Sequence, residues 1–257
     1  MNSMIDSHCH LYYEPFVNNL KETIQECKKY NIDKLLTIGV DLKTSEKSVE
    51  IANSYDEIYC TIGIHPNSTS LSSNQDLEKL ENLFKKSKKI LAIGEIGLDF
   101  YRDFELEKQF FFFEKQILLA EKLKLPIVVH TREAEEDTLR FIKKFSSKNL
   151  KFIIHCFSGS KEFALESVRL GCYISFSGNI TYKNASNIRE ACELVEIDKI
   201  LIETDSPYLS PQPLRGKKNH PSNVRFVCEQ IAQIKKEEVN TISKKTTENF
   251  NRIFFNE

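Results

Sequence analysis

The chain has 257 residues, 40% of them hydrophobic and 28% charged, with a formal net charge of -1. This composition is typical of a globular protein, and the balanced charge excludes a global basic field that would draw the molecule onto duplex DNA. No apolar run approaches the roughly 18 residues that a membrane span needs, and the N-terminus lacks the features of a signal peptide. Seven cysteines without a C-x-x-C pair fit a reducing compartment, so we expect a cytoplasmic protein.

Short apolar stretches rich in Ile, Val and Leu alternate with longer amphipathic stretches along the chain. Strands are predicted over residues 4–8, 34–40, 58–64, 90–96, 126–130, 151–156, 172–177 and 199–205. Nearly all residues of these stretches are apolar, which is typical of strands buried on both faces of a parallel sheet.

Amphipathic, helical patterns fill the intervals. They cover residues 17–30, 44–54, 76–88, 105–123, 133–146, 161–170 and 185–195, and two more follow at 222–234 and 236–254. Asp76 and Ser160 are the expected N-caps, and the run from Phe110 to Phe113 is expected to be a buried helix stripe. This alternation predicts a (β/α)₈ TIM barrel of the α/β class, with residues 1–257 as one domain. The alternative is an open doubly wound sheet, but no Gly-rich phosphate loop follows the first strand.

Histidines and carboxylates stand where most of the predicted strands end, which is the active face of such a barrel. They are His8 and His10 in "DSHCHL", His65 in "GIHP", Glu95 in "GEIGLDFYR", His130 in "HTRE", His155 in "HCFSGS" and Asp205 in "ETDSPYL". Burying so many polar groups in one mouth costs several kcal/mol unless they are paired or bind metal. Because residues i and i+2 of a strand share a side, His8 and His10 can bind one ion while Cys9 faces away and packs.

The number of candidate ligands predicts two divalent ions, because six ligands exceed what one tetrahedral site needs. Glu95 is the candidate bridging carboxylate; its alternative is a helix-capping or ion-paired glutamate, which the apolar run "ILAIGEIGL" disfavours. Imidazole and carboxylate ligands suit Zn, Mn, Fe or Ni, whereas Mg tolerates carboxylate better than imidazole.

With these motifs assembled, the chain resembles the TatD family of metal-dependent deoxyribonucleases from about residue 4 to its C-terminus. The resemblance is carried by "DSHCHL", "GIHP", "GEIGLDFYR", "HTREAEEDTL", "HCFSGS" and "ETDSPYLSPQPLRGKKN", in that order. It implies a two-metal site on Mg, Mn or Zn, and 3′→5′ exonuclease activity on single strands. In that site His8, His10, Glu95 and Asp205 would hold the first ion, and Glu95, His130 and His155 the second.

Three positions depart from the pattern that the resemblance implies. Asn67 stands where a second histidine is frequent, Tyr12 where an acidic residue is common, and His220 where a glutamate is usual. None of them removes a ligand. All three are expected near the mouth, so they bear on substrate preference.

The expected reaction is metal-assisted hydrolysis of a phosphodiester. Asp205 is expected either as a ligand alone or as a ligand that also accepts a proton from the attacking water. His65 is expected as a phosphate contact or leaving-group acid; the alternative is a structural histidine packed before Pro66. Arg132 shares a side with His130 and can bind a phosphate, or pair with Glu133 or Glu135. Glu203 is a candidate partner for a ligand histidine.

The basic loop "RGKKN" follows the last strand, so Arg215 and Lys217 are expected to contact a phosphate backbone. Tyr101, Phe157 and Tyr208 lie in loops of the same face, where they can stack on bases or pack within the loops. We expect a monomer acting on single-stranded DNA ends, with RNA as a further substrate and no membrane partner. The alternatives are a hydrolase of another ester or an amide, such as a D-aminoacyl-tRNA deacylase, and a non-catalytic binding barrel.

Overall fold

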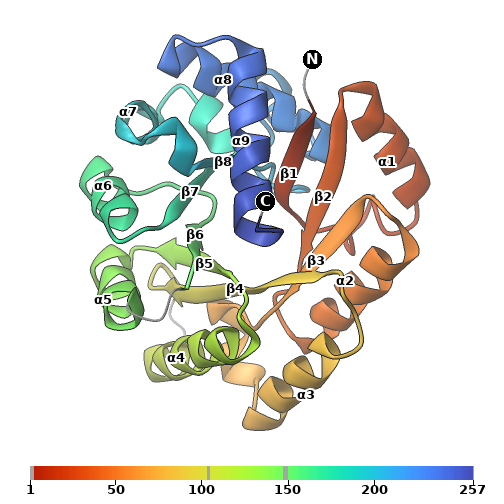
Figure 1. Cartoon of the computed structure of the whole chain (residues 1–257), viewed down its shortest axis with the longest axis vertical. Helices are drawn as coiled ribbons and strands as arrows, with labels where there is room; N and C mark the ends of the chain where they lie inside the picture. The colour runs from red at the N-terminus through yellow and green to blue at the C-terminus, as the bar shows by residue number, and fades with distance from the viewer. Residues whose placement is uncertain (1–2, 103–104, 147–149, 257) are drawn as a thin grey trace.

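The computed structural model describes residues 3–102, 105–146 and 150–256. Within these ranges eight parallel strands pair in sequence order, and helices cover the outside of the sheet (Figure 1). The strands are β1 (Met4–Cys9), β2 (Ile32–Ile38), β3 (Ile58–Ile62), β4 (Ile90–Asp99), β5 (Ile127–Arg132), β6 (Phe152–Ile154), β7 (Tyr173–Phe176) and β8 (Ile200–Ile202). The helices are α1 (Leu20–Lys29), α2 (Leu42–Ser54), α3 (Asn74–Phe84), α4 (Leu106–Leu123), α5 (Glu135–Phe145), α6 (Lys161–Arg169), α7 (Ser186–Leu194), α8 (Val224–Lys235) and α9 (Val239–Phe254). The predicted (β/α)₈ barrel is confirmed.

The barrel closes where β1 meets the segment after β8. The backbone N–H of Asp205 donates to the carbonyl of His8 at 2.9 Å, and the N–H of His10 donates to the carbonyl of Ser206 at 2.8 Å. A parallel bridge between Cys9 and Ser206 lies between these bonds. An open doubly wound sheet has no such contact between its edge strands, so that alternative is wrong. Closure itself brings polar residues of the first and last strands together.

Strand alternation positions the site above an apolar layer. An inner cluster unites one or two residues from each of several strands, and in three cases a polar residue of the site follows a cluster residue by two positions, in the strand or just after it. These pairs are Val128 and His130, Ile153 and His155, and Leu201 and Glu203. The apolar members fill the barrel, and the polar members line its carboxyl end.

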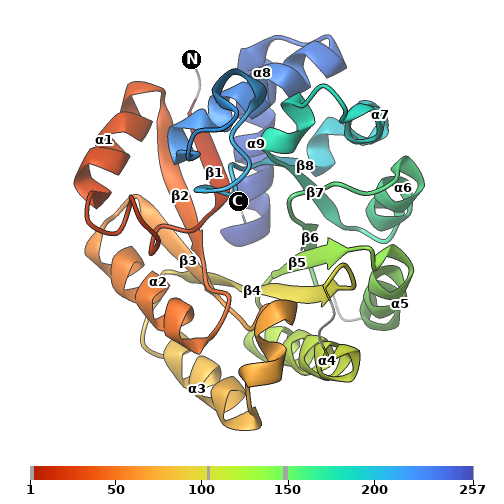
Figure 2. The same cartoon turned by 180° about the vertical axis from the view of Figure 1, so that it is seen from behind.

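Helix α9 closes the opposite end. Figures 1 and 2 show it lying across the barrel, in front of the strands in one view and behind them in the other. Its Phe250 and Ile253 are nearly fully buried and belong to the inner cluster. The hydroxyls of Ser243 and Thr247 donate to the carbonyl of Ser3, just before β1. This end is therefore packed, and the site faces away from it.

Two local expectations about the helices are wrong, and one is confirmed. Helix α3 begins at Asn74, and Asp76 is inside its first turn, where its carboxylate accepts a hydrogen bond from the N–H of Ser73. Ser160 is confirmed as the N-cap of α6, because its hydroxyl accepts from the N–H of Phe163. Four consecutive residues of a helix point to all sides, so the aromatic run of α4 is not a uniform stripe: Phe113 is buried, whereas Phe111 is 40% exposed.

All seven cysteines lie within the described residues and are free thiols. Cys9 is fully buried and directs its Sγ to the carbonyl of Leu36, away from its two histidine neighbours, as expected of a packing residue. Among the described residues, no helix is both long and apolar enough to cross a bilayer.

Candidate metal centre

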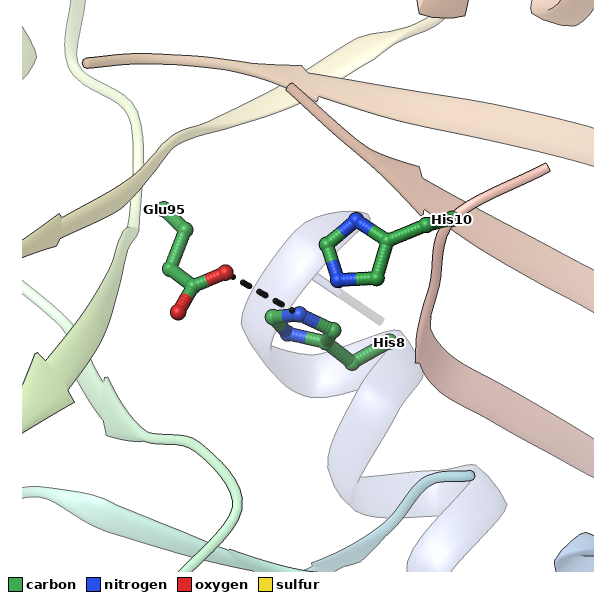
Figure 3. Close-up of side chains that lie close together, drawn as sticks. All are labelled: His8, His10 and Glu95. Carbon is green, nitrogen blue, oxygen red and sulfur yellow. Dashed lines mark ion pairs between the residues drawn. The ribbon is translucent and has the colours of Figure 1, made fainter. Parts of the chain in front are cut away.

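The two histidines of the H-x-H motif face one centre. His8 lies in β1 and His10 directly after it, and Figure 3 shows both side chains close to Glu95 of β4. His8 Nε2 lies 3.4 Å from Glu95 Oε2 and 3.7 Å from Asp205 Oδ1, and His10 Nε2 lies 3.2 Å from the same Asp205 oxygen. One group of potential ligands therefore combines residues from the first strand, from the segment after the last strand and from β4, in the middle of the strand order.

Glu95 stands between two groups of histidines. Its Oε2 faces His8, whereas its Oε1 lies 2.7 Å from His155 Nε2, 2.8 Å from His130 Nδ1 and 3.2 Å from His65 Nε2. Each carboxylate oxygen thus belongs to a different group, which is the arrangement expected of a carboxylate that bridges two cations.

The backbone places these ligands by local devices. A Cβ on Gly97 would collide with the carbonyl oxygen of His130, so glycine is required where β4 approaches β5 at the level of the site. Asp205 has a left-handed backbone with φ of 54°, a conformation that aspartate tolerates better than most residues. It turns the chain at the mouth immediately after the closing contact with β1.

Electrostatics at the centre depend on burial and on mutual pairing. Burial raises the pKa of Glu95, but the charges of His155 and His65 and hydrogen bonds from His130 and His155 more than offset this and hold it well below its usual value. Burial lowers the pKa of His155, yet Glu95 and Glu203 raise it well above the ordinary value. For His8 burial prevails and lowers the pKa. The centre therefore holds an ionised carboxylate among closely packed imidazoles.

Several buried polar atoms lack a hydrogen-bond partner among the described residues. They include both ring nitrogens of His8 and Oε2 of Glu203. His8 also stacks on His155 with ring centroids 4.0 Å apart. Unpaired nitrogens in a dry site are costly, and a divalent cation satisfies them. The residues present therefore fit a metal centre, and three overlapping groups could hold an ion: His8, His10 and Glu95; His8, His155 and Glu203; and His65, Glu95 and His130.

Three of the candidate ligand histidines have a partner on their far ring nitrogen. Tyr12 Oη lies 2.9 Å from His10 Nδ1 and Glu203 Oε1 lies 3.3 Å from His155 Nδ1, whereas Asp99 Oδ2 lies 3.6 Å from His130 Nε2, within ion-pair but beyond hydrogen-bond distance. The expectation for Glu203 is confirmed. Sequence reasoning missed Asp99, although its place at the end of the strand that carries Glu95 was a usable signal. It also treated Tyr12 only as a departure from the family pattern.

His65 faces Glu95, and its hydrogen bonds define its tautomer. Its Nδ1 accepts from the backbone N–H of Asn67 at 3.0 Å, so this nitrogen carries no proton and the neutral ring is protonated at Nε2. That Nε2–H points at Glu95 and offers no lone pair to a cation, which disfavours the one of the three groups that contains His65. The geometry therefore favours the expectation that His65 is not a ligand. Its bond to Asn67 also gives His65 the structural role that was considered as the alternative.

The predicted phosphate-binding residues divide into two positions. Arg132 lines the cavity of about 660 Å³ that contains the candidate ligands, and its guanidinium stacks 3.6 Å above the ring of Tyr101. Glu135, considered as its ion-pair partner, instead accepts hydrogen bonds from Ser160. Arg102, which the sequence reasoning did not single out, lines the same cavity.

The basic loop lies outside this cavity. Arg215 and Lys217 are exposed and are not among its lining residues, and the Arg215 guanidinium stacks 3.9 Å from the ring of Tyr182. A phosphate that contacted these two residues would therefore lie outside the cavity, at another nucleotide of a polymeric substrate.

The candidate aromatic residues also differ. Tyr101 is 58% exposed and Tyr208 52% exposed, whereas Phe157 is 1% exposed. The expectation that Phe157 could stack on a base is wrong, because its ring packs against Phe163 and Phe176. A loop position at the active face did not reveal that this ring points into the core.

Two of the three departures from the family pattern lie at the centre. Asn67 lines the cavity, and Tyr12 contacts a candidate ligand directly. His220 lines no part of that cavity; its Nδ1 accepts from the N–H of Ser222 and its ring packs against Phe16. The expectation that His220 bears on substrate choice has no support in this placement.

Comparisons with known proteins agree with this geometry. A family model described as TatD related DNase matches residues 5–255. The chain is 38% identical to the metal-dependent hydrolase YabD of Bacillus subtilis, and the match covers 98% of each chain. It is 36% identical to the metal-dependent hydrolase MJ1582 of Methanocaldococcus jannaschii, over 93% of this chain and 91% of that protein. Among solved structures it resembles YJJV, a TatD homologue from Escherichia coli, with a TM-score of 0.94 and 27% identity over 98% of each chain.

Proposed function

This chain belongs to the TatD-related DNase family of metal-dependent hydrolases, and we propose that it is a two-metal phosphodiesterase that removes nucleotides from the 3′ ends of single-stranded DNA. RNA with a free 3′ end is a further substrate in this proposal. The observation that carries it is the division of the Glu95 carboxylate between His8 on one side and His130 and His155 on the other.

In this proposal the ligand sets follow the two sides of Glu95. His8, His10, Glu95 and Asp205 would hold one divalent ion, and Glu95, His130 and His155 would hold the other. Bound ions of this kind lower the pKa of water and neutralise the charge of a phosphate. Mg, Mn and Zn are the candidate metals, and the histidine-rich set favours Mn or Zn over Mg.

Asp205 is the proposed proton acceptor for the attacking water. Its side chain is 15% exposed and lines the cavity, so water reaches it. Burial raises its pKa, but the hydrogen bond with His10 and the charges of His8 and His10 more than offset this and lower it. The carboxylate is therefore ionised at neutral pH, as a proton acceptor must be.

His65 and Arg132 are the proposed contacts to the phosphate. Burial lowers the pKa of the His65 ring, so its Nε2–H is a neutral donor, which would have to turn from Glu95 to reach a phosphate oxygen. A neutral ring is better suited to a hydrogen bond with a phosphate oxygen than to protonation of a leaving group. Arg132 can donate two parallel hydrogen bonds to a phosphate from its place on Tyr101.

The deciding experiment compares 3′-labelled and 5′-labelled single-stranded DNA in EDTA, Mg²⁺, Mn²⁺ and Zn²⁺. We expect metal-dependent, stepwise shortening from the 3′ end that disappears in Glu95→Gln and persists in the matched control Glu22→Gln, an exposed glutamate of α1. Absence of cleavage with every metal, in a protein that still binds two ions, would sink the phosphodiesterase proposal. Aminoacyl-tRNA and other ester and amide substrates would then be tested.

A further inference from the structure

Two exposed tyrosines share the cavity of the metal centre. Tyr13, in the turn after β1, is 38% exposed, and Tyr208, in the loop after β8, is 52% exposed. Both line the same cavity as His10, Glu95 and Asp205. We refer to Tyr13 and Tyr208 as the tyrosine pair. Large aromatic side chains left open to solvent beside a catalytic centre are candidates for substrate contact.

The tyrosine pair lies directly against a candidate ligand. The ring centroids of Tyr13 and Tyr208 are each 6.0 Å from that of His10, and 6.2 Å from one another at an interplanar angle of 76°. This edge-to-face contact covers part of one ring's face with the edge of the other, and both side chains remain open to solvent. A flat group stacked on the exposed ring surface would lie next to the candidate metal centre.

The Tyr13 ring and the backbone of Tyr208 are held by neighbouring residues. Tyr12 is hydrogen-bonded to His10 Nδ1, and its ring packs against Tyr13 with centroids 4.5 Å apart. The backbone N–H of Tyr208 donates to the carbonyl of Asp205 at 2.9 Å, which ties this loop to a candidate ligand. The pair is therefore pre-ordered, so that stacking a ligand on it costs little conformational entropy.

The surroundings of the tyrosine pair are compatible with a polyanion. On the other wall of the cavity, Arg102 and Arg132 supply positive charge. The exposed Tyr101 at that wall already has one ring face covered by Arg132. The tyrosine pair thus offers the free aromatic surface, and the opposite wall offers the cations.

We propose that the tyrosine pair is a binding site for an unpaired nucleobase, which positions the terminal nucleotide of a single strand beside the metal centre. The inference rests on the proposed phosphodiesterase function and names the part of the substrate that this cavity recognises. Bases of every kind have an aromatic face, so the site selects single strands without selecting a sequence. A base within a duplex must first be unpaired and unstacked before it can bind there.

The test uses the full-length protein with Mn²⁺ and two phosphorothioate-linked oligonucleotides that resist cleavage. One is a thymidine decamer, and the other has the same length and charge but lacks every base. We expect the thymidine strand to bind about 5-fold to 100-fold more tightly, as measured by fluorescence anisotropy. Tyr13→Leu and Tyr208→Leu are expected to reduce this ratio toward one. Tyr208→Phe, which keeps the ring, and Tyr30→Leu, an exposed tyrosine that ends α1, are expected to keep it.

Equal binding of the two strands by the unmodified protein would overturn the inference, as would a ratio that survives both leucine variants. Thermal melting of each variant checks that it is folded. Cleavage of ordinary strands reads the proposed function separately. A protein that cleaves DNA but ignores the bases retains the function and loses the tyrosine site. One that prefers bases but cleaves nothing retains the site and loses the function.

Discussion

At the scale of single residues, the partner on the far nitrogen of a ligand histidine decides which nitrogen faces the metal. Among the described residues, His155 has the carboxylate of Glu203 as this partner and His130 has that of Asp99, whereas His10 has the phenol of Tyr12. A carboxylate increases the basicity of the ring more than a phenol does. In the proposed two-metal site, an ion held by His8 and His10 is therefore expected to bind less tightly than one held by His130 and His155.

Replacing Tyr12 with phenylalanine tests this role. The variant keeps the ring that supports Tyr13 but removes the oxygen 2.9 Å from His10 Nδ1, so His10 can rotate or bind in the wrong tautomer. We expect the affinity for the weaker of two Mn²⁺ ions to fall about 10-fold to 100-fold, with little change in the tighter ion. Titration calorimetry of the metal-free protein resolves the two binding steps.

The control for this substitution is Tyr30→Phe, the same chemical change at a tyrosine that stacks on Arg225. A rescue is available in Tyr12→Glu, which offers a carboxylate to the same nitrogen and should restore or increase the affinity. If Tyr12→Phe lowers both affinities equally, Tyr12 supports the fold of the mouth as a whole and the assignment to His10 fails.

The residues that the sequence revealed are those whose position follows from strand order. His8, His10, Glu95, His130, His155 and Asp205 lie together because parallel strands of a barrel end at one face. Whether a loop side chain turns inward depends on contacts between distant segments, which no local pattern records. Phe157 therefore could not be told from Tyr208, although one is buried and the other is exposed.

At the scale of elements, a buried carboxylate joins the first strand to the segment after the last. Asp6 of β1 is fully buried and accepts hydrogen bonds from the N–H and the hydroxyl of Thr204 and from the N–H of His8. Asn219 adds a bond from its side chain to the carbonyl of Thr204. These contacts hold Asp205 against His8, so barrel closure and the geometry of the metal centre depend on the same residues.

Asp6→Ala is expected to lower the free energy of unfolding by about 2–4 kcal/mol, because it leaves the buried donors of Thr204 without an acceptor. Asp6→Asn should lose less, since its amide oxygen can still accept from the Thr204 N–H. Urea denaturation followed by circular dichroism measures both. Asp33→Ala, in the exposed part of β2, is the control and should change stability by less than about 0.5 kcal/mol. A comparable loss in the control would show that the method reports a general effect of removing aspartate.

The order and type of the elements were predictable, because buried apolar runs and amphipathic runs differ in period. The residues at which these elements begin and end were less predictable. The last strand was predicted over 199–205 but ends at Ile202, where the chain leaves the sheet to turn through Glu203 and Asp205. Helix α3 begins before Asp76, because Ser73 caps it and donates hydrogen bonds from its N–H and its hydroxyl to the Asp76 carboxylate. Sequence alone does not distinguish a cap from a residue in the first turn.

At the scale of the whole molecule, the barrel has two ends with different tasks. The carboxyl end carries the candidate metal centre, and the amino end is sealed by α9, whose Phe250 is buried in the inner cluster. The sequence predicted α9 as a helix but not its position, because its apolar residues match any buried face. An apolar layer including Val128 and Ile153 separates the two ends.

This separation predicts that metal binding and core packing contribute to stability independently. Mn²⁺ at about 100 times the dissociation constant of one site should stabilise the folded chain by about 2.7 kcal/mol through that site, which raises the Tm by about 5–10 °C for a chain of this size. Phe250→Ala should lower the Tm by leaving a cavity, at a cost of about 3–5 kcal/mol, yet keep the increase with metal. Glu95→Gln should keep the fold and lose that increase, because the carboxylate between the two histidine groups is gone. Scanning calorimetry with Mn²⁺ and with EDTA measures all three proteins.

Effects of distant sites add, so a Phe250→Ala protein that no longer responds to metal would show that the apolar layer transmits strain from α9 to the metal centre.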